Sequence, residues 1–144
     1  MRRSKRRSAA SSKPQPEPTL FLDRNLGRHV IADCLRVEKI TVEVHDDHLP
    51  PDAPDEEWIA LVGRQDWVAI TKDRNIRYRA AELDAIQRHA ARVIVVRMKN
   101  ATGPDIAALL LRARRRIARF VATTDPPFVA GIFGNGTIKA YEIV

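Results

Sequence analysis

The feature that most constrains the fold is an uninterrupted run of branched apolar residues from Val93 to Val96, bounded by Arg92 and Arg97. A strand with one face in water alternates apolar and polar residues, whereas an uninterrupted apolar run is typical of a strand covered on both faces. Such strands occur in parallel sheets that carry helices on each side. The run therefore predicts an α/β fold with a mostly parallel central sheet.

The rest of the chain alternates in the way that such a fold requires. Further strands are predicted at Thr19–Leu22, Ile40–His45 and Trp67–Thr71. Apolar residues at helical spacing predict helices over Leu26–Leu35, from Asp52 or Pro54 to Val62, around Ala81–Ala90, and over one long segment from Gly103 to Val121. Two apolar runs on either side of Gly134-Asn135-Gly136 predict a C-terminal β-hairpin.

The chain divides into a basic tail and one domain. Its formal charge is +7, and residues 1–18 hold six basic residues against the single acid Glu17, a net charge of 6 − 1 = +5. Few large apolar residues occur there, so residues 1–18 are predicted to be disordered, with residues 19–144 as the folded domain. A basic tail favours contacts with nucleic-acid phosphates, and a solubilising extension explains it equally well.

The cysteine content and the hydropathy indicate a protein of the cytoplasm. Cys34 is the only cysteine, so no internal disulfide can form and a reducing compartment is expected. Cys34 lies in an apolar helical stretch and is predicted to be packed inside the domain. No apolar run reaches the length of about 18 residues that indicates a membrane span, so no membrane association is expected.

Several acidic residues follow predicted strands. Asp23 comes directly after the first strand, and Asp73 follows the third. Asp55 and Glu57 lie in the first turn of the helix that follows the second strand. Ligands bind parallel sheets at the carboxyl ends of the strands, so we expect these acids to converge there. Each also has a purely structural explanation: Asp23 as a helix N-cap, Asp55 and Glu57 as partners of the helix dipole, and Asp73 as a turn residue.

Convergent carboxylates predict a hard cation. They repel one another and are costly to desolvate unless a positive charge neutralises them. Oxygen ligands of this kind suit Mg²⁺ or Mn²⁺, which can bind a phosphodiester and lower the pKa of a bound water. Metal-assisted hydrolysis is therefore the favoured chemistry.

Three segments carry a family resemblance. Phe21–Gly27, Asp55–Ile59 and Trp67–Ile76, in this order and spacing, resemble the PIN-like domains of bacterial VapC-type toxins, in a variant branch with an Asp-x-Asn-Leu start and a Thr-x-Asp strand end. The resemblance implies a Rossmann-like, three-layer PIN-like fold over residues 19–144. It implies a Mg²⁺- or Mn²⁺-dependent endoribonuclease acting on RNA. It also implies the toxin of a type II toxin–antitoxin pair, with a cognate antitoxin protein as partner. A homodimer is compatible with the family, although no pattern in the chain encodes it.

The resemblance assigns roles to individual residues. It implies that Asp23, Asp55 and Asp73 are metal ligands, with Glu57 as a further candidate. Asn25 would orient a water or the scissile phosphate, and Thr71 would hydrogen-bond a ligand carboxylate. One departure is Asn75, where relatives often carry a further acid. A neutral residue there weakens a second metal site.

Two alternatives to the nuclease stay open. The first is a non-catalytic PIN-like module that binds nucleic acid or protein through the tail and the arginines of the long helix. These arginines are Arg112, Arg114, Arg115, Arg116 and Arg119. A solvated helix face explains them equally well. The second, less favoured because of the basic tail, is a metal-dependent phosphatase acting on small molecules.

Overall fold

The fold is known from a computed structural model that describes residues 15–143. The predicted basic tail therefore lies almost wholly outside the described residues. Glu17, near the C-terminal end of that tail, is among the described residues. Its carboxylate accepts two hydrogen bonds of 3.0 and 3.1 Å from Arg114. Among the described residues, no helix is long and apolar enough to cross a bilayer.

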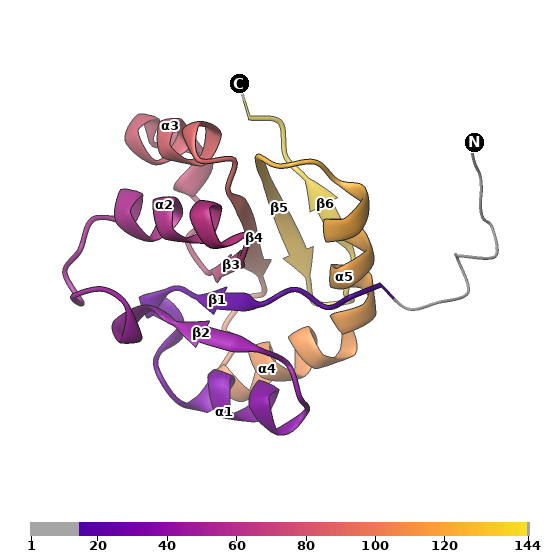
Figure 1. The fold of residues 1–144 in the computed structure, drawn as a ribbon. Helices are drawn as coiled ribbons and strands as arrows, with labels where there is room; N and C mark the ends of the chain where they lie inside the picture. The colour runs from indigo at the N-terminus through magenta and orange to yellow at the C-terminus, as the bar shows by residue number, and fades with distance from the viewer. Residues whose placement is uncertain (1–14, 144) are drawn as a thin grey trace.

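A single six-stranded sheet forms the centre of the molecule, in the order β2-β1-β3-β4-β5-β6 (Figure 1). The strands are β1 (Leu20–Leu22), β2 (Val42–Val44), β3 (Val68–Thr71), β4 (Arg92–Arg97), β5 (Phe128–Phe133) and β6 (Ile138–Ala140). The first five run parallel, and β6 pairs with β5 in the antiparallel direction. The predicted parallel sheet and C-terminal hairpin are both confirmed.

Helices cover both faces of this sheet (Figure 1). They are α1 (Val30–Val37), α2 (Asp55–Gln65), α3 (Ala80–Arg88), α4 (Gly103–Arg112) and α5 (Arg114–Thr123). Helices α1, α4 and α5 pack on one face, and α2 and α3 pack on the other. Short 3₁₀ helices occupy Arg24–Leu26, His45–Asp47 and Ile76–Tyr78. The result is the predicted three-layer α/β architecture.

Successive strand residues supply the two cores. In β1, Leu20 and Leu22 enter the core beneath α1 and α4, whereas Phe21 enters the core beneath α2 and α3. Every residue of β1 is buried because side chains of a strand alternate between two covered faces. The same holds for the four central residues of β4. This is the physical basis of the uninterrupted apolar run in the sequence.

Two predicted helices are each interrupted. The segment over Leu26–Leu35 splits at Gly27, whose φ of 79° lies in the left-handed region that glycine adopts readily. The long helix over Gly103–Val121 breaks at the buried Ala113. A straight helix of that length would span about 30 Å, against about 20 Å for a six-residue strand. The break keeps the second half over the sheet, where Phe120 meets Phe128 at a ring-centroid distance of 5.1 Å.

The prediction that Cys34 is packed inside the domain is wrong, because its side chain is exposed. It lies on the solvent-exposed side of α1, whereas Ile31 and Leu35 on the same helix are buried. The local pattern was apolar enough to suggest burial, but the helix turns this residue towards solvent.

Candidate active site

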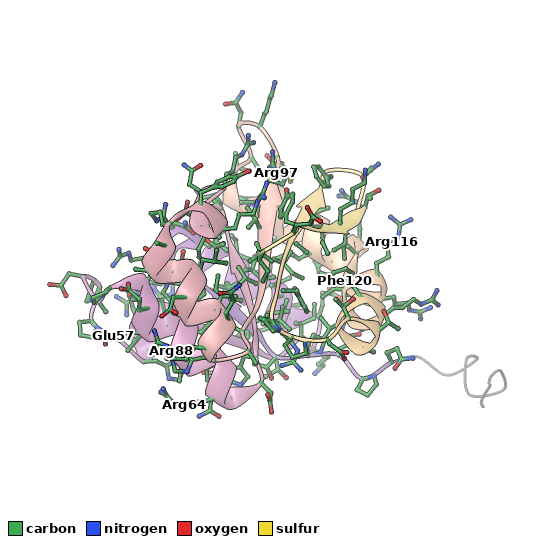
Figure 2. The ribbon with its side chains drawn as sticks, turned by 90° about the horizontal axis from the view of Figure 1, so that it is seen from above. Glu57, Arg64, Arg88, Arg97, Arg116 and Phe120 are labelled. Atoms are coloured by element: carbon green, nitrogen blue, oxygen red, sulfur yellow. The ribbon has the colours of Figure 1, made fainter. Side chains whose placement is uncertain are left out.

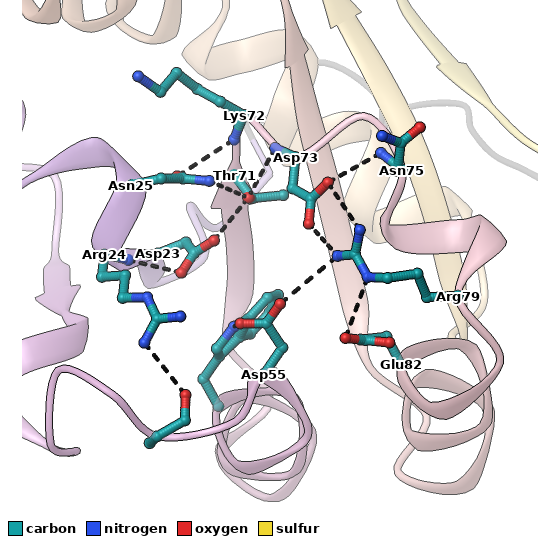
Figure 3. A network of polar contacts seen from close by, with 12 residues as sticks. Asp23, Arg24, Asn25, Asp55, Thr71, Lys72, Asp73, Asn75, Arg79 and Glu82 are labelled. Atoms are coloured by element: carbon teal, nitrogen blue, oxygen red, sulfur yellow. Dashed lines mark hydrogen bonds and ion pairs between the residues drawn. The ribbon is translucent and has the colours of Figure 1, made fainter.

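The candidate site lies where β1 and β3 end side by side (Figure 3). Leu22 pairs with Ile70 across the parallel ladder, so Asp23 and Thr71 follow at the same edge of the sheet. Asp55 is the first residue of α2, the helix that covers this part of the sheet. The expected convergence of separate chain segments at the carboxyl edge is therefore present.

Asp23 is the most enclosed acid of the site, with a relative exposure of 4%. Its Oδ1 accepts a hydrogen bond from the backbone N–H of Arg24 at 2.7 Å. Its Oδ2 accepts one from the hydroxyl of Thr71 at 2.8 Å. The first contact caps the short helix over Arg24–Leu26, so the structural role considered for Asp23 is real and coexists with its place in the site.

Burial raises the pKa of Asp23 above its ordinary value. The hydrogen bond from Thr71 opposes this shift, because it stabilises the charged form, and the negative charge of Asp55 adds to it. A buried carboxyl beside a second carboxyl is the environment in which a bound cation gives the greatest electrostatic relief.

Thr71 links three parts of the site through one hydroxyl group. It is fully buried at the end of β3 and donates to Asp23. The same oxygen accepts from the Asn25 side-chain amide at 3.2 Å and from the backbone N–H of Asp73 at 3.1 Å. The hydrogen bond expected between Thr71 and a candidate ligand carboxylate is therefore present.

Two sets of contacts position Asp55: a hydrogen bond to its own side chain and contacts to the loop that precedes it. The indole N–H of the fully buried Trp58 donates to Asp55 Oδ1 at 3.0 Å. The guanidinium of Arg24 donates to the carbonyl oxygens of Pro51 and Ala53, in the loop that leads into α2. These contacts hold the start of α2 against the turn that carries Asp23.

Arg79 lies between the carboxylates of Asp55, Asp73 and Glu82 (Figure 3). The guanidinium of Arg79 pairs closely with Asp73 and also contacts Asp55 at 3.7 Å and Glu82 at 3.2 Å. The Asp73 carboxylate raises the pKa of Arg79 above its ordinary value, so this side chain stays charged. Arg79 thus supplies the positive charge that the acids require.

Sequence reasoning missed Arg79. The only local signal is its spacing of three residues from Glu82 on the adjoining helix, a common surface pair. Its contacts with Asp55 and Asp73 join separate segments, and no periodicity reveals such contacts. Within residues 15–143, no group of three or more His, Cys, Asp or Glu side chains is arranged so as to hold a metal ion.

Of the remaining predicted site residues, Asn25 joins the network and Glu57 does not. The Asn25 side-chain oxygen accepts from the backbone N–H of Lys72 at 3.5 Å, so its amide spans the ends of both strands. Glu57 is exposed on the outside of α2 and its side chain makes no hydrogen bond or ion pair within the described residues (Figure 2). Asn75 contributes its backbone N–H to Asp73 at 3.0 Å.

The arginines of α4 and α5 mostly bind their own chain. Arg112 and Arg116 donate to the carbonyl oxygens of Gly134 and Asn135 in the hairpin turn. Arg114 donates to Glu17 and to the carbonyl of Glu38. Three of these arginines, for which a partner contact and a solvated helix face were equally good explanations, are therefore engaged within the domain.

A family comparison agrees with this geometry. The family model described as a PIN like domain matches residues 18–98, which is more than half of the 144-residue chain. The matched stretch includes Asp23, Asp55, Asp73 and Arg79 and ends just after β4. No curated protein and no solved structure matches the chain. With its parallel sheet, its acids at the carboxyl edge and this match, the chain belongs to the PIN-like domain family, whose members are generally nucleases.

Proposed function

We propose that the chain is a metal-dependent endoribonuclease. The observation that carries the proposal is the convergence of Asp23, Asp55 and Asp73 at one edge of the sheet, with Asp23 almost fully buried. Unlike Asp55 and Asp73, which contact Arg79, Asp23 has no cationic side-chain partner within the described residues, so a bound cation would compensate the charge that its burial disfavours. Membership of a nuclease-type family supports the same chemistry.

The donor atoms fit a divalent cation in kind. Carboxylate and amide oxygens are the ligands that Mg²⁺ and Mn²⁺ prefer, and the site offers Asp23, Asp55 and Asp73, with Asn25 beside them. In position, Asp55 and Asp73 face Arg79 instead of a common centre. Metal binding therefore requires these two carboxylates to release Arg79. The cation and the guanidinium compete for the same oxygens.

The side chains of the site would have different roles in the proposed reaction. Asp23, Asp55 and Asp73 would hold the cation, which when bound would polarise the phosphodiester and acidify the attacking water. Thr71 fixes the orientation of Asp23 through its hydroxyl, and Trp58 fixes that of Asp55. With Asp55 and Asp73 on the cation, Arg79 would keep its contact with Glu82 and its positive charge would be free to bind the negative phosphodiester.

The biological role proposed here follows from the resemblance. We propose a toxin of a type II toxin–antitoxin pair that acts in the cytoplasm on RNA and is neutralised by a cognate antitoxin protein, with Mg²⁺ or Mn²⁺ as cofactor. The motifs around Asp23, Asp55 and Asp73 support this role. A homodimer is compatible with it.

The proposal is tested by incubating a mixed cellular RNA pool with the purified chain and Mn²⁺, Mg²⁺ or EDTA. We expect cleavage that requires metal and falls about a hundredfold or more in Asp23→Asn and Asp73→Asn, because each removes a charge from the cation site. Asp84→Asn is the matched control, since Asp84 is an exposed acid of α3 that, within residues 15–143, pairs with Arg88 alone. Folding of each variant is checked by circular dichroism.

A second candidate function is a non-catalytic binding module on the same fold. Two observations favour it: Arg79 already neutralises Asp55 and Asp73, and Asn75 takes the place of a further acid. The same RNA assay separates the two functions. Cleavage that persists in EDTA or survives in both aspartate variants would refute the metal-dependent nuclease. RNA binding by folded protein without any cleavage would support the module.

A further inference from the structure

A cavity opens next to the chain segment that carries Asp73. It measures about 280 Å³, and its walls include Lys72, Arg74, Val96, Met98, Asn100 and Ile106. Lys72 and Arg74 flank Asp73 in the chain, and consecutive Cα atoms lie about 3.8 Å apart. The cavity, called here the basic cavity, therefore adjoins the candidate active site at the carboxyl edge of the sheet.

The two cations of the basic cavity have no acidic partner. Within residues 15–143, the side chains of Lys72 and Arg74 take part in no ion pair or hydrogen bond, in contrast to Arg79, Arg88 and Arg114. Figure 3 shows the Lys72 side chain directed away from the acid cluster. No acidic residue lines the cavity. Both charges are therefore available to an anion approaching from solvent.

The opposite wall has a different chemistry. Val96 and Ile106 close the bottom of the cavity but are almost fully buried, so the half-buried Met98 supplies its accessible apolar surface. Asn100 adds a neutral side chain that can both donate and accept hydrogen bonds. A cation pair, an apolar surface and an amide in one cavity match the phosphate, the flat ring and the polar edge of a nucleotide.

We propose that the basic cavity binds one nucleotide of single-stranded RNA, next to the phosphodiester held at the acid cluster. The nucleotide's phosphate contacts Lys72 and Arg74, and its base lies on Met98 with Asn100 at its edge. The substrate class rests on the proposed function, and the binding site does not depend on cleavage. The volume of about 280 Å³ is close to the lower end of the range of about 300–1,000 Å³ for small-ligand sites, which is the scale of one nucleotide.

An acidic peptide fits the basic cavity less well. Carboxylates would satisfy Lys72 and Arg74, but they would leave the exposed part of Met98 uncovered. A nucleotide uses both walls. RNA also has to reach the adjoining acids for the proposed reaction, and a nucleotide held here places its neighbouring phosphate beside Asp73.

The test is binding of a fluorescein-labelled single-stranded RNA to the full chain in EDTA, so that no cleavage occurs, measured by anisotropy at several salt concentrations. We expect Lys72→Ala/Arg74→Ala to bind about tenfold or more weakly. Its salt dependence should have a slope smaller by about 0.7, because the two side chains together neutralise one phosphate of the strand. The basic segment 1–14 is common to all proteins tested, so the difference reports on the cavity.

The matched control removes two charges from the opposite edge of the sheet. Arg64 and Arg88 lie in the last turns of α2 and α3, and both are exposed (Figure 2). We expect Arg64→Ala/Arg88→Ala to weaken binding much less than the cavity variant. An equal loss in both double variants, or no loss in the cavity variant, would overturn the proposal.

A second variant tests the apolar wall independently of charge. Met98→Trp fills the basic cavity, and we expect it to weaken binding of normal RNA without changing the salt slope. An abasic strand should bind the wild-type protein more weakly than normal RNA, and Met98→Trp should reduce that difference. Equal binding of abasic and normal RNA to the wild-type protein would mean a phosphate contact alone and would overturn the nucleotide site. Loss of binding to an acidic peptide in the cavity variant, with RNA binding intact, would assign the cavity to a protein partner.

Discussion

Asp23 carries a stability cost that its place in the site explains. The side chain is almost fully buried, and its pKa is raised chiefly by that burial and further by Asp55. In the folded protein the charged form of Asp23 therefore stands in surroundings that disfavour it. Such a cost is common where a residue is placed for function, because the charge is useful only when a ligand compensates it.

Asp23→Asn is therefore expected to be inactive and, without metal, at least as stable as the wild-type protein. With a folded pKa above the unfolded value of about 3.9, the native state holds more protons between the two values, so Asp23 stabilises the fold at low pH. This contribution is lost as the pH rises through the folded pKa. The difference in unfolding free energy, variant minus wild type, should therefore rise from about pH 4 upward. Urea unfolding in EDTA at several pH values measures it, and a difference that falls with pH would contradict the assignment.

At the scale of elements, the sequence predicted most of what is present. The run from Arg92 to Arg97 is β4 with the same bounds, and the hairpin around Gly134-Asn135-Gly136 is β5 and β6. Periodicity succeeds at these positions because the residue pattern and the covered faces agree. It failed at Gly27 and Ala113, where the helix breaks depend on a turn and on the width of the sheet instead of on apolar spacing.

The contact between α2 and α3 gives a prediction at this scale. A Cβ added at Gly63 would lie 2.3 Å from the carbonyl oxygen of His89, a backbone atom that cannot swing aside. Gly63→Ala should therefore destabilise the protein by about 1–3 kcal/mol, although alanine normally favours a helix. Gly134→Ala is the control, since open space surrounds that position and little change is expected. Thermal unfolding measures both, and a Gly63→Ala variant more stable than wild type would contradict this packing.

At the scale of the whole molecule, the sequence predicted that Asp23, Asp55 and Asp73 lie at one edge of the sheet. It did not predict that Arg79 lies between Asp55 and Asp73. Asp23 and Asp73 could be placed because parallel strands end at a common edge. Arg79 could not, because its partners Asp55 and Asp73 lie in other segments and its reach depends on the packing of α2 beside α3. Glu57 shared the helix start with Asp55, but its direction around the helix takes it to the outer surface.

The most direct test of the central claim is a titration of Mn²⁺ into the full chain, with free Mn²⁺ followed by electron paramagnetic resonance. Wild-type protein should bind Mn²⁺ saturably. Arg79→Met should bind it several-fold more tightly, because the competing guanidinium is gone, and Asp23→Asn should bind it at least tenfold more weakly. Absence of saturable binding in both the wild-type protein and Arg79→Met, or equal binding in all three proteins, would contradict a metal site at these carboxylates.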